Sequence, residues 1–351
     1  MFLTSPTIYD VHNLVTIRTN IAGLLPEYFA QAERKRDRLY DIEIFLLTSD
    51  IIDNIVNDLT IEIYTGSLGG PIIGFAKNAI YAELRLPFLG MCSNKLTFRT
   101  MVKKVENRYQ AFIEFSKFFK FQPIMYRVKT YLQKLTHLLL TLQLLEKNCL
   151  FTHSAAVSCN SNGILIFAFS NTGKTPTSQF LAMSGMKYMS DDHTIIGGGP
   201  TIYAFPEKSG RLSRLREKTP LLDYLLPRKG LTYNFEVNPK AILKYICILS
   251  LSKAQDRVMA LPLEQSLEKL IALNNEEILS FLSSPLTYLT VYSSFHGIFP
   301  SLERIFSAYK KTLTDILSGS DVMVYEIRSN PEKFGIIIKQ ILKGQCNFFK
   351  E

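Results

Sequence analysis

The sequence lacks the features that mark several common classes of protein. It has no run of five or more like charges, no repeat of basic and aromatic residues and no spacing typical of a zinc site, which disfavours a nucleic-acid-binding module. No apolar run reaches the roughly 18 residues that a membrane span needs. The first ten residues also lack the basic and apolar regions of a secretion signal. We therefore expect a cytoplasmic protein that binds neither nucleic acid nor a membrane.

Cysteine is also scarce. The five cysteines are scattered, odd in number and mostly set in apolar segments: Cys92, Cys149, Cys159, Cys247 and Cys346. This pattern predicts buried thiols in a reducing compartment and not a disulfide framework.

The chain does have ample material for a core. Its 351 residues are 47% hydrophobic, which is enough for one large domain or two of ordinary size. Its net charge of +9 favours an anionic partner such as a nucleotide, an acidic peptide or nucleic acid. The charge alone does not choose between these partners.

The patterning predicts two domains, residues 1–122 and 123–351. The first mixes short alternating runs, such as 59–64 and 79–86, with glycine-rich turns, which indicates a small α+β domain. A helix is predicted over 123–148, and the chain then alternates strand and helix in the manner of an α/β fold. The predicted strands are 155–158, 164–168, 187–190, 242–251 and 322–328, and the predicted helices are 174–184, 262–273 and 331–342.

A candidate phosphate-binding loop follows the strand predicted at 164–168. The pattern GxxxxGK(S/T) is met at its last three positions by Gly173, Lys174 and Thr175, while Ala168 replaces the first glycine. A loop between an apolar strand and a helix places the helix dipole against anionic phosphate. The alternative is a polar turn with a solvated lysine. The loop residues predicted to bind the nucleotide are Ser170, Asn171, Thr172, Gly173, Lys174, Thr175 and Pro176.

Two carboxylates and a histidine add to this site. Asp191 and Asp192 end the strand predicted at 187–190, where one can hold Mg²⁺ while the other accepts the proton of an attacking hydroxyl. His153 begins the strand before the loop strand, and both a structural role and a role near the transferred phosphate are open. His193 is more consistent with a structural role.

A basic cluster lies in the turn-rich segment 207–220. Its members are Arg211, Arg214, Arg216 and Lys218. Arginine pairs bidentately with phosphate and carboxylate, so Arg214 and Arg216 are candidates for contact with the triphosphate or an acidic substrate. A solvated basic face is the alternative.

These motifs resemble the HPr kinase family and the wider group of phosphoenolpyruvate-carboxykinase-like P-loop kinases, over residues 123–345. The resemblance implies a mixed sheet flanked by helices, with ATP and Mg²⁺ as cofactors. It also implies that Lys174 contacts the β and γ phosphates, that Thr175 and Asp192 bind Mg²⁺, that Asp191 or Asp192 activates the acceptor, and that His153 assists.

Three functions follow. The first is an ATP- and Mg²⁺-dependent kinase acting on a hydroxyl, with serine in a peptide or small protein as acceptor and residues 1–122 choosing the substrate. The second is a kinase of a small molecule such as free serine. The third is a catalytically silent nucleotide sensor. The sequence is also compatible with a homo-oligomer.

Overall fold

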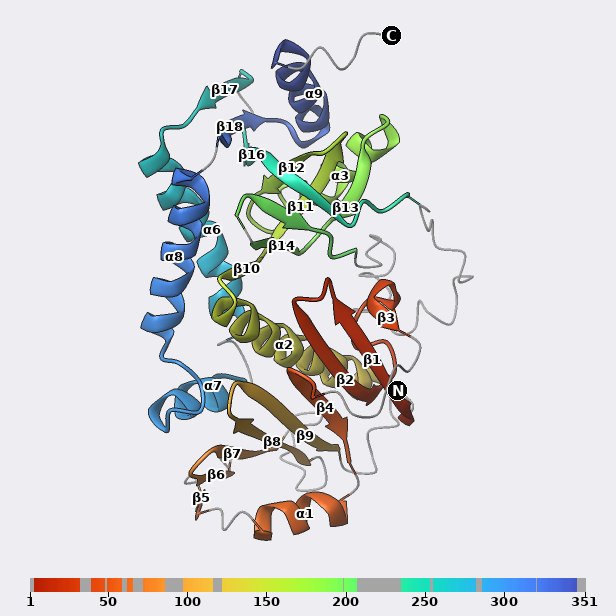
Figure 1. Cartoon of the computed structure of the whole chain (residues 1–351), viewed down its shortest axis with the longest axis vertical. Helices are drawn as coiled ribbons and strands as arrows, with labels where there is room; N and C mark the ends of the chain where they lie inside the picture. Colours follow the sequence, from red (N-terminus) through yellow and green to blue (C-terminus); the bar gives the residue numbers. More distant parts are fainter. Residues whose placement is uncertain are drawn as a thin grey trace. The chain divides into compact units, whose positions relative to one another are not determined.

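A computed structural model describes the chain over residues 3–31, 39–47, 49–58, 62–65, 72–85, 97–115, 122–197, 199–206, 235–252, 255–281, 286–319 and 321–345. The chain divides into two compact units. Of the described residues, unit 1 holds those up to 147 and those in 279–306, and unit 2 holds the others. Figure 1 shows the elements of each unit.

Unit 1 is built on a mixed nine-stranded sheet in the order β3-β1-β2-β4-β9-β8-β7-β6-β5. Its strands are β1 (Leu3–Val11), β2 (Val15–Ile21), β3 (Ala30–Gln31), β4 (Ile42–Leu46), β5 (Glu62–Thr65), β6 (Ile72–Ala76), β7 (Ala79–Arg85), β8 (Thr97–Val105) and β9 (Arg108–Phe115). β4 pairs in parallel with β2 and β9, and the other pairs are antiparallel. In β2 every second residue is buried, which is the alternation of a sheet with one face on a core.

Helices cover this sheet. They are α1 (Ser49–Asp58), α2 (Gln122–Glu146) and α7 (Leu286–Phe295), with a short 3₁₀ turn, η1 (Glu27–Phe29). α2 contacts β2 and β4, and the Tyr131 hydroxyl donates to Thr100 Oγ1 at 3.0 Å. Leucines at three- and four-residue steps are buried along α2, as the sequence pattern predicts.

Unit 2 is built on a second nine-stranded mixed sheet. Its strands are β10 (Cys149–Thr152), β11 (Ser154–Cys159), β12 (Asn162–Phe167), β13 (Lys187–Ser190), β14 (Thr194–Gly197), β15 (Thr201–Tyr203), β16 (Lys240–Leu251), β17 (Arg257–Ala260) and β18 (Met323–Ser329). β12, β16 and β18 form a parallel trio, and antiparallel β11 and β13 extend it beyond β12. The carboxyl ends of β12, β16 and β18 therefore meet at one edge of the sheet, where open α/β sheets bind ligands.

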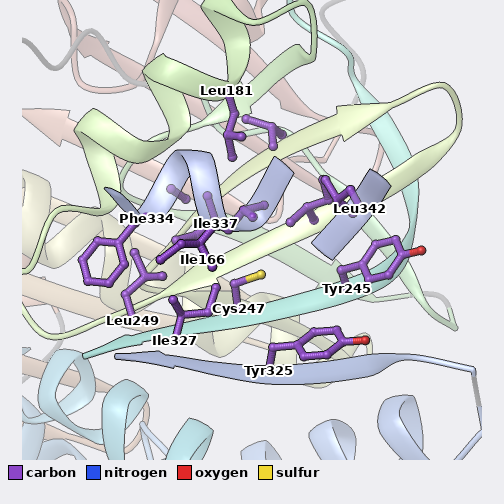
Figure 2. Close-up of a cluster of buried hydrophobic side chains, with 14 of the residues drawn as sticks. Ile166, Leu181, Tyr245, Cys247, Leu249, Tyr325, Ile327, Phe334, Ile337 and Leu342 are labelled. Atoms are coloured by element: carbon purple, nitrogen blue, oxygen red, sulfur yellow. The ribbon is translucent and has the colours of Figure 1, made fainter. Parts of the chain in front are cut away.

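Two helices of unit 2 pack against one face of its sheet. These are α3 (Lys174–Met183) and α9 (Phe334–Gln345), which follows the short 3₁₀ turn η4 (Pro331–Lys333). Figure 2 shows Phe334, Ile337 and Leu342 of α9 gathered with Ile166 and Cys247 of the sheet, and these side chains belong to one buried apolar cluster. α6 (Leu263–Phe281) and α8 (Leu302–Ser318) each have residues in both units.

Most elements predicted after residue 122 are confirmed. The predicted helix at 123–148 is α2, the strand at 187–190 is β13, and the helix at 174–184 is α3, which ends before Gly185 in the left-handed region (φ +95°). The helix predicted at 262–273 continues to Phe281 as α6, and that at 331–342 begins as η4. The predicted limits 1–122 and 123–351 place α2 in the second domain, whereas the division into units places it in the first, against β2 and β4.

The cysteine prediction is tested at three positions. Cys149 and Cys247 are buried and Cys159 is half-buried, while Cys92 and Cys346 lie outside the described residues. Burial raises the pKa of the Cys247 thiol to about 12, so this thiol is inert at neutral pH. Within the described ranges, none of the helices combines the length and the apolar character needed to cross a bilayer.

Candidate active site

The candidate site forms where chain connections meet at one end of the second sheet. β10 passes into β11 through His153, and β13 passes into β14 through residues 191–193. Because β10 pairs with β14 and β11 pairs with β13, these two connections lie together. Ser154 also pairs with Phe167, so residues 168–173 begin beside His153. The topology therefore brings the histidine, the aspartate pair and the candidate loop to one strand end.

A buried hydroxyl network holds the two connections together. The Ser190 and Thr194 hydroxyls lie 2.6 Å apart, and Thr194 Oγ1 donates to the Ser154 carbonyl at 2.9 Å. Thr152 Oγ1 donates to the Thr194 carbonyl at 3.0 Å and lies 2.9 Å from Ser154 Oγ. Each hydroxyl has one proton, so Ser190 and Ser154 are the donors in the two hydroxyl pairs. These hydrogen bonds thus fix the residues next to His153 and Asp191 in sequence.

The loop between β12 and α3 has a backbone suited to binding an anion. Asn171 (φ +64°) and Gly173 (φ +121°) both have positive φ, and the Thr172 amide donates to the Phe169 carbonyl at 3.2 Å. Alternation of right- and left-handed residues turns successive amides toward one side. Three loop residues are exposed, namely Phe169, Ser170 and Asn171. The loop therefore presents its backbone at the surface, directly before the N-terminus of α3.

Lys174 is buried at the base of this loop. Its side chain lies at the first position of α3, is 6% exposed, and its Nζ donates to the Ala168 carbonyl at 2.8 Å. Thr175 Oγ1 of α3 lies 3.5 Å from the Asp191 carbonyl oxygen, so the first turn of α3 contacts the backbone of the connection that carries the two aspartates. Pro176 is exposed in the first turn of α3, where a missing amide proton is tolerated.

The two aspartates have different surroundings. Asp191 is 1% exposed, whereas the Asp192 side chain is 23% exposed. Asp192 Oδ1 lies 3.9 Å from His153 Nδ1, and the His153 backbone amide donates to Asn274 Oδ1 of α6 at 3.2 Å. Asp192 is therefore the member of the pair that an external group can reach.

His193 has a packing role. It is 5% exposed and stacks on Phe151, with ring centroids 4.8 Å apart and planes at 2°. Phe205 lies edge-on to both rings. This aromatic cluster agrees with the structural role predicted for His193.

The structure therefore places most of the predicted site residues at one strand end. Ala168, residues 170–176, Asp191, Asp192 and His153 lie there, whereas Arg211, Arg214, Arg216 and Lys218 lie outside the described residues. Asn274 was missed because it is 121 residues from His153 in sequence and nothing in α6 marks it. Thr194 was missed because its role appears only once β10 and β14 pair.

The oxygen donors of the site suit Mg²⁺ that is bound partly by waters and substrate phosphates. They suit less well a metal ion bound by protein side chains alone. No group of three or more histidine, cysteine, aspartate or glutamate side chains that could hold a metal occurs in the described part of the chain. Mg²⁺ is commonly held by one or two carboxylates together with waters and substrate phosphates. Thr175 and Asp192 supply a hydroxyl and a carboxylate of this kind.

Comparison with known proteins gives little. No protein-family model matches the chain, and no curated protein matches it. A solved structure of the HPr(Ser) kinase/phosphatase from Coxiella burnetii is similar at 12% identity over 56% of this chain and 95% of that chain, with a TM-score of 0.24. At that TM-score the similarity carries no argument about fold or function, so the site is interpreted from its own residues.

Proposed function

We propose that this protein is a phosphotransferase that moves the γ-phosphate of ATP to a hydroxyl group. The observation that carries the proposal is that the helix opened by a phosphate-type loop contacts the backbone connection that carries Asp192, a partly exposed carboxylate. Lys174 and Thr175 begin α3 directly after the loop, and the Thr175 hydroxyl lies 3.5 Å from the carbonyl of Asp191, the neighbour of Asp192. Phosphoryl transfer needs mainly positioning and charge neutralisation, which such a set supplies.

The loop and the start of α3 would bind the triphosphate. The loop amides other than that of Thr172, which donates to the Phe169 carbonyl, would donate to phosphate oxygens. The positive end of the helix dipole favours the anion. Lys174 already lies along the loop, with its Nζ on the Ala168 carbonyl. On nucleotide binding we expect this ammonium group to exchange the carbonyl for a β- or γ-phosphate oxygen. Mg²⁺, bound by the Thr175 hydroxyl together with waters and phosphate oxygens, would neutralise charge on the phosphates.

We assign the proton transfer to Asp192. The acceptor hydroxyl oxygen forms a bond to the γ-phosphorus while the bond from that phosphorus to the β–γ bridging oxygen breaks, leaving ADP. The hydroxyl proton passes to the Asp192 carboxylate. His153, with Nδ1 3.9 Å from Asp192 Oδ1, would orient that carboxylate. Asp191 is too buried to receive the proton and instead supports the connection through its backbone.

For the acceptor we propose serine in a peptide or small protein, chosen by unit 1. This finer assignment rests on the family resemblance of residues 123–345 and on the excess of basic residues, which suits an acidic peptide. A small-molecule kinase acting on free serine and a silent nucleotide sensor are the alternatives. Cytoplasmic location and the absence of nucleic-acid and membrane partners stay predictions.

The test is transfer from γ-labelled ATP with Mg²⁺, using the full chain alone, with free serine and with a pool of serine-containing peptides. Lys174→Ala and Asp192→Asn are the site variants, and Lys187→Ala is the matched control, because Lys187 is an exposed lysine of the same unit whose ion pair is with Glu236. Label on peptide that both site variants lose and the control keeps supports the kinase. Label on free serine favours the small-molecule alternative, and binding without transfer favours the sensor.

A further inference from the structure

The short 3₁₀ turn η4, directly before α9, packs on the phosphate-type loop. A Cβ atom placed on Gly173 would lie 3.4 Å from Pro331 Cβ and 3.7 Å from Phe334 Cδ2. Gly173 has φ +121°, a conformation that side-chain-bearing residues rarely adopt. Gly173 therefore has an unusual backbone conformation, and η4 and the first residue of α9 pack next to it.

α9 also approaches α3 as closely as a glycine allows. A Cβ atom on Gly335 would lie 2.2 Å from Phe180 Cδ1, so any larger residue requires the Phe180 ring to shift or the two helices to separate. Phe334 is fully buried in the apolar cluster that Figure 2 shows, together with Leu249 and Ile327. The start of α9 therefore contacts both the loop and the helix that the loop opens.

Polar contacts fix the connection from β18 into α9. Ser329 Oγ donates to Asp256 Oδ1 at 2.6 Å, and Lys333 Nζ donates to Asp256 Oδ2 at 3.0 Å. These hydrogen bonds hold the pKa of the Asp256 carboxyl below its usual value. Asn330 Oδ1 accepts from the Glu332 amide at 3.3 Å and caps the turn. These contacts thereby fix the positions of Pro331 and Phe334 next to Gly173.

We infer that Pro331, Phe334 and Gly335 are positioning residues for the nucleotide, which act by bracing Gly173 and the start of α3. The inference rests on the proposed function and deepens it. The loop must hold its amides and Lys174 in place before phosphate arrives, because a misplacement of about 1 Å in such a site costs on the order of a hundredfold in reaction rate. α9 supplies that support from a part of the chain more than 150 residues beyond the loop, since Gly173 and Phe334 are 161 positions apart (334 − 173).

The experiment compares two substitutions in the same helix and the same apolar cluster. Phe334→Leu loosens the contact with Gly173, whereas Leu342→Ala removes buried volume about two helical turns further on. The readouts are the Kd for ATP with Mg²⁺ and the melting temperature of the full chain. We expect both variants to melt earlier, and only Phe334→Leu to weaken ATP binding, by about tenfold or more.

A double substitution gives the second test. Gly335→Ala should weaken ATP binding by pushing α9 from α3, and Phe180→Ala in the same chain should restore much of the affinity by removing the ring that clashes. Equal ATP affinity in wild type, Phe334→Leu and Gly335→Ala overturns the inference while leaving the proposed function intact. No ATP binding by the wild-type chain overturns the proposed function and the inference with it.

Discussion

The two units contain the same local step, a parallel-paired strand followed by a helix, and the candidate site lies at the step in unit 2. In unit 1, β4 ends at Leu46 and α1 begins at Ser49, so only residues 47 and 48 lie between them. In unit 2, β12 ends at Phe167 and α3 begins at Lys174, which leaves residues 168–173 for a loop. A strand and a helix alone do not bind phosphate; the loop between them needs length and left-handed residues to expose its amides.

Both units hold charged groups in ion pairs, and the Asp192 carboxylate differs from these groups in its neighbours. In unit 1, Arg99 pairs with Asp53 and Glu114, and Lys147 pairs with Asp41, so these charges stabilise the sheet and its connections. In unit 2, Asp192 lies at a strand end, 3.9 Å from His153 and partly exposed. Asp192 is thus distinguished from Asp41 and Asp53 by its neighbours and not by its exposure, since the Asp41 and Asp53 side chains are 26% and 56% exposed.

The largest expected effect is on transfer. Asp192→Asn removes the proton acceptor and should lower phosphate transfer by about 10²- to 10⁴-fold while ATP binding stays within a few-fold. Asp53→Asn, which changes an exposed carboxylate of unit 1, should leave transfer unchanged. The measurement is the initial rate with γ-labelled ATP for both variants. Equal rates for wild type and Asp192→Asn would remove Asp192 from the mechanism.

A smaller effect is expected from the glycines with positive φ. Gly173→Ala and Gly185→Ala each force alanine into a left-handed conformation, at a cost of about 1–2 kcal/mol in unfolding free energy. A Cβ on Gly185 meets open space, whereas one on Gly173 meets Pro331 at 3.4 Å. Urea denaturation should show a loss in both variants, and ATP titration should show weaker binding only in Gly173→Ala. The contrast fails if Gly185→Ala weakens ATP binding as much.

The smallest effect is on the acid sensitivity of unit 1. Burial alone would raise the pKa of Asp41, but hydrogen bonds from Lys147 and Thr16 outweigh it, so this pKa lies below the ordinary value of 3.8. A lowered folded-state pKa stabilises the fold above pH 3.8, and that stabilisation is lost as the pH falls through the folded value. Asp41→Asn should therefore cost about 1 kcal/mol at pH 7, with solvent screening taken into account, and progressively less in acid.

The check is urea denaturation of wild type and Asp41→Asn across this pH range, with ATP binding measured at pH 7. We expect the two stability curves to converge in acid and ATP affinity to be the same in both proteins. A constant gap at all pH values would show that the aspartate charge is not what stabilises the connection.

Local patterns in the sequence predict α2 of unit 1 and much of unit 2. The apolar steps along α2, the strand before Ala168 and the glycine after α3 are signals within a few residues of each other, and the structure has elements there. Asn171 lies in the left-handed region at φ +64°, which asparagine adopts more readily than most residues. The prediction of a small α+β domain for residues 1–122 did not specify the strand order of the sheet in unit 1. A nine-stranded sheet is determined by pairings between distant strands, which local patterns do not show.

The support around the site could not be predicted for the same reason. Asn274 reaches the His153 amide, and Phe334 reaches Gly173, only because β16 and β18 pair beside β12 and bring later segments to the loop. The different burial of Asp191 and Asp192 is likewise a result of packing, since the two residues are identical in sequence terms.

The most direct test of the account is equilibrium binding of ATP to the full chain in the presence of Mg²⁺, with wild type, Lys174→Ala and Lys187→Ala compared side by side. The account predicts saturable binding by wild type and Lys187→Ala, and a loss of at least about tenfold in Lys174→Ala, because the buried ammonium is lost from the loop. Equal affinity in all three proteins, or no binding by any of them, would contradict the assignment of residues 168–175 as the phosphate site.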